Sequence, residues 1–346
     1  MRTPTDARGW SYRMKTLSRL KDGFGRTIDD LRISLTDRCN FRCIYCMPVE
    51  GLAWLSKSEV LHSDEILYLA RIFIGLGIRT IRLTGGEPLM RQDIGALTEG
   101  LTRLEPTLDL SMTTNGFFLQ EKARCLAAAG LKRINVSLDS LQPERFARMV
   151  RRDGQLIFKI LDGLRVARDA GLHPIKLNCV VMRGYNEDEV VDFARLGREH
   201  DYQVRFIEFM PLDAQGGWSR QAVVPGAEIR ARIHAVLPLA PASANGTEPA
   251  TVHRFADGRG SIGIIASVTE PFCDNCNRIR ITADGQLRTC LFSLHEHNLK
   301  GLLRSGATDE ELANFILGAV WNKEAGHKIN QLDFVRPSRS MAVIGG

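Results

Sequence analysis

The chain has 346 residues and a formal net charge of +6; 44% of its residues are hydrophobic and 25% are charged. This composition is ordinary for a soluble globular protein, and the length allows one large domain or a barrel with an extension. No apolar run is long enough to span a bilayer and none reads as a secretory signal, so we expect a cytoplasmic protein. The small net charge suits an anionic small substrate as well as RNA and selects neither.

The first 21 residues are basic, with one acidic residue, Asp6, among Arg2, Arg8, Arg13, Lys15, Arg19 and Lys21. An organellar transit peptide is one interpretation of this pattern. A solvated tail is the simpler one, and it predicts a flexible basic segment over residues 1–24.

A cysteine-rich loop follows an apolar run at 31–35 that is typical of a strand. Cys39, Cys43 and Cys46 have the spacing C-x-x-x-C-x-x-C. Three thiolates with no fourth nearby can bind three irons of a four-iron cluster and leave one iron open, as a site that does chemistry requires. The alternative is a pair of buried cysteines with a chance third. The spacing resembles that of radical S-adenosylmethionine (SAM) enzymes, whose open iron holds the amino and carboxylate groups of SAM.

Strand-like and helix-like stretches then alternate as far as residue 210. Apolar runs typical of strands lie at 31–35, 80–84, 108–113, 133–138, 175–182 and 204–209, and amphipathic stretches at 64–76, 94–104, 120–129, 156–170 and 187–199. This α/β pattern predicts a parallel sheet with right-handed crossovers. About 250 residues are needed for a complete eightfold barrel. We therefore expect an open, six-stranded partial (β/α)6 TIM-like barrel over residues 25–224.

Polar residues follow each predicted strand, and in βα barrels such strand ends meet at one mouth. After the second strand, Gly85 and Gly86 allow close backbone approach to a ligand, and we expect this loop and Glu87 to hold the ammonium of SAM. A simple turn is the alternative. Tyr45 is expected to place its backbone or ring against adenine, or to pack the cysteine loop.

The region at 225–346 is expected to be an α+β extension with short strands near 261–268 and 278–282, helices near 298–304 and 309–321, and an unpatterned tail from 336. It carries a second cysteine trio, Cys273, Cys276 and Cys290. Its spacing suits zinc with His295 or His297, or a second four-iron cluster. The first trio favours iron, because an open iron facing the mouth can bind substrate. Clustering in threes argues against a disulfide framework.

A third group of candidate site residues consists of cationic side chains. Arg32, Arg82 and Lys176 lie within apolar strands, and Arg278 and Arg280 alternate along another, so both face one side. Unpaired buried charges are unfavourable, so one explanation is pairing with Glu87, Glu208 or Asp139. Convergence on one mouth instead predicts a site for a triphosphate-sized anion, since arginine forks suit phosphate.

Together these motifs resemble one family, the GTP 3′,8-cyclase (MoaA) family of molybdenum cofactor biosynthesis, within the radical SAM superfamily. The resemblance runs from about Asp22 to Gly346. It is carried by TDRCNFRCIYCMP, RLTGGEPLMR, TTNG, INVSLDS, RFIEFMP, FCDNCNRIRIT, the later Cys290 and the terminal Gly345-Gly346.

The resemblance implies roles for individual residues. Cys39, Cys43 and Cys46 would hold a [4Fe-4S] cluster and, with Arg278 and Arg280, be catalytic. Cys273, Cys276 and Cys290 would hold a second [4Fe-4S] cluster. SAM would contact Tyr45, Gly86, Ser137 and Met210. GTP would contact Arg32, Arg82, Thr113, Lys176, Arg278, Ile279 and Arg280, and the Gly-Gly tail would reach into the active site.

The implied reaction is a reductive radical cyclisation. A 5′-deoxyadenosyl radical from SAM removes the ribose 3′ hydrogen of GTP, and the sugar carbon then bonds to guanine C8. Implied partners are a flavodoxin or ferredoxin as electron donor, a downstream cyclic pyranopterin synthase and a second copy in a homodimer, with no nucleic acid or membrane. A peptide maturase or RNA-modifying radical SAM enzyme, or a non-catalytic Fe–S or zinc electron-transfer protein, are the alternatives.

Overall fold

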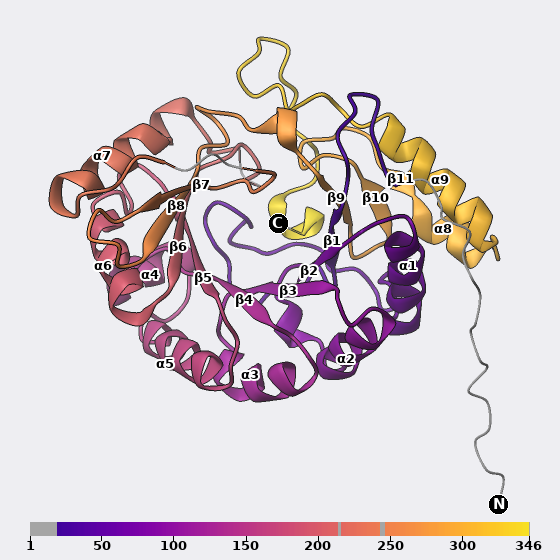
Figure 1. Ribbon diagram of the computed structural model, residues 1–346, viewed down its shortest axis with the longest axis horizontal. Coiled ribbons are helices and arrows are strands. Elements are labelled where there is room, and N and C mark those ends of the chain that lie inside the picture. Colours follow the sequence, from indigo (N-terminus) through magenta and orange to yellow (C-terminus); the bar gives the residue numbers. More distant parts are fainter. Residues whose placement is uncertain (1–18, 214–215, 243–245, 346) are drawn as a thin grey trace, which may run out of the picture.

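The computed structural model describes residues 19–213, 216–242 and 246–345. At its centre is a parallel sheet formed by β1 (Asp30–Ser34), β2 (Thr80–Thr84), β3 (Asp109–Thr114), β4 (Arg133–Ser137), β5 (Ile175–Val181) and β6 (Gln203–Glu208). These strands neighbour each other in chain order and curve around a central space (Figure 1). The expected partial barrel is therefore confirmed, and the ends of its six strands lie within two residues of those predicted.

Helices cover the outside of the curved sheet (Figure 1). They are α1 (Ser63–Gly75), α2 (Ile94–Leu104), α3 (Leu119–Ala128), α4 (Pro143–Val150), α5 (Leu156–Asp169), α6 (Val190–His200) and α7 (Gly226–Val236). Their buried faces pack on the outward side chains of the strands, such as Leu31, Ile81 and Leu110, to form the main core. The sequence analysis missed α4 and α7. In α4 only Phe146, Met149 and Val150 are buried, which is too short a stripe for a clear helical period.

The C-terminal region extends the same sheet at both edges, which the expectation of a six-stranded barrel with a separate extension did not include. β9 (Arg278–Ile281) pairs in parallel with β1, and β8 (Ser261–Ile265) pairs in parallel with β6. The antiparallel strands β7 (Thr251–Arg254), β10 (Gln286–Arg288) and β11 (His297–Asn298) then complete an 11-stranded sheet. Added strands satisfy the backbone groups that β1 and β6 would otherwise leave unpaired.

One expected flexible segment and one segment without a predicted element are packed against the rest of the protein. Residues 1–18 of the expected basic tail lie outside the described residues, but Leu20 is fully buried and its backbone N–H bonds Leu76 O at 3.1 Å. At the other end, where no pattern was found, α10 (Met341–Ile344) lies in the middle of the ring of strands (Figure 1). Its buried Ala342 and Ile344 explain why it is held there.

The remaining helices, α8 (Leu299–Arg304) and α9 (Asp309–Trp321), pack beside β10 and α1. The structure confirms both, and α9 begins with a capping box between Thr308 and Glu311, a strong start signal in the sequence. Within the described residues, no helix combines the length and apolarity needed to cross a membrane.

Candidate active site

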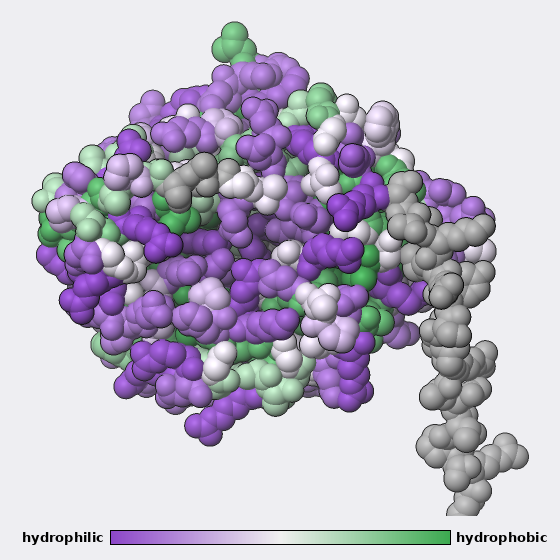
Figure 2. Space-filling view, viewed as in Figure 1, coloured by the Kyte–Doolittle hydropathy of each residue, from purple (hydrophilic) through white to green (hydrophobic). Residues whose placement is uncertain are grey.

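A cavity of about 290 Å³ occupies the mouth of the barrel. Hydrophilic side chains gather around the hollow at the centre of this face (Figure 2). Both cysteine trios line the cavity, as do residues from the ends of β1 to β6, from β9 and from α10. The predicted convergence of six strand ends on one mouth is thus confirmed, because parallel strands bring their carboxyl ends to one edge.

The first trio lies in a tightly held loop. Cys43 O accepts hydrogen bonds from the backbone N–H of Cys46 at 2.9 Å and of Met47 at 3.0 Å. Cys39 Sγ accepts from Phe41 N at 3.4 Å, and Arg42 Nη1 donates to Cys39 O at 2.7 Å. These contacts fix the loop with its sulfur atoms toward the cavity.

The chemistry of these thiols fits a cationic metal group. All three are free cysteines, and burial raises the pKa of Cys39 to about 11 and of Cys46 to about 12. The nearby thiols add to the shift for Cys43 and Cys46, because neighbouring thiolates repel each other. Bound iron would reverse this by stabilising the thiolates. The described residues contain no group of three or more His, Cys, Asp or Glu side chains that could hold a single metal ion.

The Gly-Gly turn after β2 packs directly against the cysteine loop. Gly86 N donates to Thr36 O at 2.7 Å, and a Cβ on Gly86 would lie 2.3 Å from Arg38 O. Only glycine allows this approach. The expectation that Glu87 binds the ammonium of SAM is wrong, because its fully buried carboxylate instead accepts from Thr114 Oγ1 and Asn115 N, both at 2.7 Å, and from Leu89 N at 2.9 Å.

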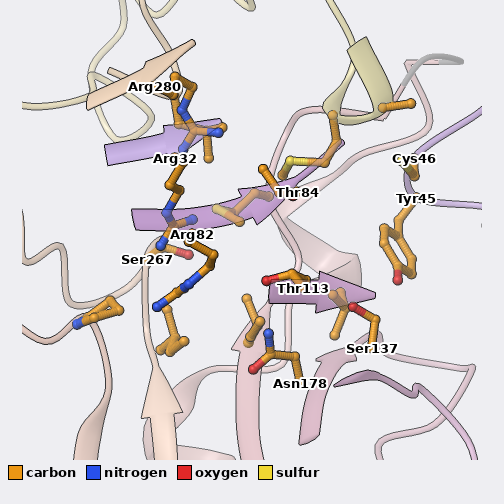
Figure 3. A pocket seen from close by; sticks show the side chains of 18 of the residues that line it. Arg32, Tyr45, Cys46, Arg82, Thr84, Thr113, Ser137, Asn178, Ser267 and Arg280 are labelled. Atoms are coloured by element: carbon orange, nitrogen blue, oxygen red, sulfur yellow. The ribbon is translucent and has the colours of Figure 1, made fainter. Parts of the chain in front are cut away.

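The residues predicted to contact SAM lie on one side of the cavity. Tyr45, Gly86, Ser137 and Met210 all line it, and Figure 3 shows Tyr45 beside Cys46, with Ser137 on the same side of the pocket. Tyr45 Oη donates to Asp139 Oδ2 at 2.7 Å, so the ring bridges the cysteine loop and the end of β4. The ring therefore packs the cysteine loop, as one interpretation predicted, and it also faces the cavity, while its contact with adenine stays a prediction.

The second trio faces the same cavity from the C-terminal region. Cys276 N donates to Cys273 O at 3.0 Å, and Arg278 Nη2 donates to Cys276 Sγ at 3.6 Å. Burial opposes ionisation of Cys276, but Arg278 and Lys323 outweigh it and lower its pKa to about 7. The buried Lys323, which the sequence analysis missed, donates to Arg278 O at 3.0 Å and to Thr289 O.

The histidines considered as zinc ligands lie elsewhere. His297 packs edge-on against Phe315 with ring centroids 6.2 Å apart, and neither it nor His295 lines the cavity. His327 does line it, and its Nδ1 is buried without a hydrogen-bond partner. Sequence reasoning missed His327, because it lies in a loop and does not follow a predicted strand. These positions do not support the zinc interpretation with His295 or His297.

Arginine side chains form a row across three neighbouring strands. Arg32 on β1 is in register with Arg82 on β2 and with Arg280 on β9. Figure 3 shows the three together across the pocket from Tyr45 and Cys46. Burial lowers the pKa of Arg32, and neighbouring Arg82 adds to this effect. Such a row of buried cations is favourable for an anionic ligand.

The carboxylates that were the alternative partners of these cations are engaged elsewhere. Glu208 is fully buried and accepts from Gly226 N and Val268 N, both at 2.7 Å. The Nε atoms of Arg32 and Arg278 are buried without a hydrogen-bond partner. A buried donor without an acceptor is unfavourable, so these two arginines favour a ligand that supplies hydrogen-bond acceptors.

Two residues predicted to contact GTP do not line the cavity, while one that was missed does. Ile279 is buried in the core, and Lys176 is 5% exposed and is not among the lining residues. Thr113 lines the cavity as predicted, and so does Arg205 on β6. Arg205 is a cation in an apolar strand, the same signal that singled out Arg32, Arg82 and Lys176.

Comparison with known proteins shows which family the chain resembles. Residues 33–197 match the Radical SAM superfamily model, and residues 202–329 match the model named Molybdenum Cofactor Synthesis C. The chain is 48% identical over 330 residues to the GTP 3′,8-cyclase of Streptomyces coelicolor, covering 94% of this chain and 96% of that protein. It is 46% identical over 346 residues to the GTP 3′,8-cyclase of Paenarthrobacter nicotinovorans, covering 94% and 97%.

A solved structure shares the fold at low sequence identity. Streptococcus suis SuiB bound to its precursor peptide matches with a TM-score of 0.62 at 12% identity, covering 90% of this chain and 74% of that one. This likeness concerns the fold alone, because the sequences have diverged. The cysteine trios, the arginine row and the full-length similarity to curated relatives agree, and the chain belongs to the GTP 3′,8-cyclase family of radical SAM enzymes.

Proposed function

We propose that this chain converts GTP to (8S)-3′,8-cyclo-7,8-dihydroguanosine 5′-triphosphate in molybdenum cofactor biosynthesis. The names of its relatives support this reaction, and one observation on the structure of this chain supports it independently. Two cysteine trios and a row of arginines line a single cavity. One end has ligands for a radical-generating group, and the other has cations for a nucleotide.

At the first end, Cys39, Cys43 and Cys46 would hold the [4Fe-4S] cluster that carries SAM. When bound, this cluster and SAM supply the 5′-deoxyadenosyl radical that removes the ribose 3′ hydrogen. Gly86 would present its backbone to SAM, Tyr45 would lie against the adenosyl part, and Ser137 and Met210 would complete the pocket. All of these residues line the cavity, and the hydrogen bond from Tyr45 to Asp139 holds the ring in place.

At the other end, the arginine row would hold GTP. Arg32, Arg82 and Arg280 lie side by side, and a row of forks fits successive phosphates. We add Arg205 to the residues of the triphosphate site, because it lines the cavity together with Arg82; burial, and to a smaller degree the charge of Arg82, lowers the pKa of Arg205. Holding the triphosphate fixes the ribose relative to SAM, and a misplacement of about 1 Å is enough to lower the rate of such a reaction about 100-fold.

Cys273, Cys276 and Cys290 would hold a second [4Fe-4S] cluster with an iron open to guanine. The free thiols and the position of the trio in the cavity support this, and Arg278 and Lys323 would compensate the negative charge of the thiolates. Arg26 contributes from the N-terminal segment by donating to Cys273 O at 2.7 Å. Residues 25–224 would thus form the SAM-binding part of the enzyme and residues 225–346 the part with the second cluster.

The partners follow from the chemistry. A one-electron donor such as a flavodoxin or ferredoxin would reduce the first cluster, and a cyclic pyranopterin synthase would consume the product. A homodimer is proposed on the family resemblance alone.

The direct test is an anaerobic assay of reconstituted protein with SAM, GTP and a reductant. We expect 5′-deoxyadenosine and the cyclised triphosphate in equal amounts. Cys273→Ala should leave SAM cleavage possible but abolish cyclisation, while Cys125→Ala, at an exposed position on α3, is the matched control and should change nothing. SAM cleavage at the same rate with and without GTP would contradict the proposed substrate.

A further inference from the structure

One carboxylate lies against the cations of the proposed triphosphate site. Glu248 Oε2 accepts a hydrogen bond from Arg205 Nη2 at 3.0 Å. Its charge also acts on Arg82 and Lys176, which stand on neighbouring parts of the sheet. Glu248 belongs to the loop before β7, and the next residue, Pro249, lines the cavity. A carboxylate therefore reaches the same cations that the nucleotide needs.

The two members of this ion pair differ strongly in how they are held. The side chain of Arg205 is 8% exposed, whereas that of Glu248 is 53% exposed. Arg205 lies on β6, which pairs with a strand on each side, so its backbone is held by the sheet. The half-exposed carboxylate lies on a loop and can turn into solvent with little loss of packing.

We propose that Glu248 is a resident counter-anion of the triphosphate site, which occupies Arg205 in the nucleotide-free protein and is displaced when phosphate binds. This inference rests on the proposed GTP site and deepens it. Without nucleotide, the carboxylate reduces the mutual repulsion among Arg82, Lys176 and Arg205. With nucleotide, the same carboxylate competes with the phosphate oxygens for Arg205 and would repel them if it stayed.

Removal of this charge then has two effects of opposite sign. Glu248→Gln keeps the size of the side chain and loses its charge. The nucleotide-free protein should become less stable, because the cations lose their counter-charge. Phosphate binding should become stronger, because no carboxylate has to leave Arg205. A residue that only stabilises the loop would show the first effect without the second.

The experiment is isothermal titration calorimetry on reconstituted, oxygen-free protein, without SAM or reductant so that no turnover occurs. The probes are GTP, inorganic tripolyphosphate and guanosine. We expect Glu248→Gln to bind GTP and tripolyphosphate about two- to fivefold more tightly than the unaltered protein, because a half-exposed carboxylate is a weak competitor for Arg205. Guanosine affinity should not change, and the variant should show a lower melting temperature without ligand.

Glu228→Gln is the matched control, because Glu228 pairs with Arg183 and Arg232 and does not line the cavity. It should leave all three affinities unchanged. Equal or weaker tripolyphosphate binding by Glu248→Gln would overturn the inference, and so would equal tightening for guanosine. If tripolyphosphate binds more tightly but GTP yields no cyclised product, the counter-anion stands and the proposed reaction fails.

Discussion

Gly86→Ala adds only one methyl group, but it should disable the enzyme. A Cβ at this position would lie 2.3 Å from Arg38 O and 2.6 Å from both Arg38 C and Asp37 O. All three atoms belong to the backbone of the cysteine loop, so no side chain can turn away. To reach an ordinary contact of about 3.4 Å, the loop or the turn after β2 must move by about 1 Å.

Such a shift acts on two levels. Overpacking of this kind costs about 1–3 kcal/mol of folding free energy, and here it also breaks the bonds from Gly86 N to Thr36 O and from Glu87 N to Arg38 O. A movement of about 1 Å between the loop and the SAM pocket should lower kcat/KM about 100-fold. We therefore expect weaker retention of the first cluster and a loss of activity larger than the loss of stability alone explains.

The assay combines iron content, the electron paramagnetic resonance signal of the reduced first cluster, and kcat/KM for GTP. Gly318→Ala is the control, because Gly318 is exposed on α9 and a Cβ there meets no atom within 4 Å. That variant should be more stable by up to about 1 kcal/mol, since alanine favours a helix. Unchanged kcat/KM and cluster signal in Gly86→Ala would refute the steric argument.

Three further predictions concern other parts of the site. Burial, with a smaller contribution from Arg205, lowers the pKa of Lys176 to about 8, so Lys176 loses its proton as pH rises through 8. Lys176 does not line the cavity, but its charge acts together with those of Arg205 and Arg82, so the Kd for GTP should increase from pH 7 to 9.5; a flat profile would exclude an electrostatic contribution of Lys176 to binding. Thr114→Val should destabilise the protein by about 1.5–3 kcal/mol in urea unfolding, because it removes a donor from the buried Glu87 carboxylate; less than 0.5 kcal/mol would contradict this. Anaerobic Cys273→Ala should hold about four irons per chain against about eight in the unaltered protein, and equal counts would remove the second cluster.

The sequence alone determined that the chain forms a barrel and which residues lie at most positions around the mouth of that barrel. Strand and helix periods differ, so the alternation up to residue 210 specified both the elements and their parallel arrangement. Parallel strands bring their carboxyl ends to one edge of the sheet, so the sequence predicts that Cys39, Gly86 and Ser137 lie together. The spacing of the two cysteine trios similarly indicated metal ligands, because ligands close in sequence need little tertiary information.

Only the tertiary structure decided which strands close the sheet and which polar groups face the cavity. β8 and β9 join opposite edges of the sheet because β6 and β1 offer unpaired backbone groups there, a demand that no local pattern shows. Glu87 and Glu248 have the same side chain, but one is fully buried under three donors and the other lies against Arg205. That difference arises from contacts between residues distant in the chain, which periodicity and spacing do not encode.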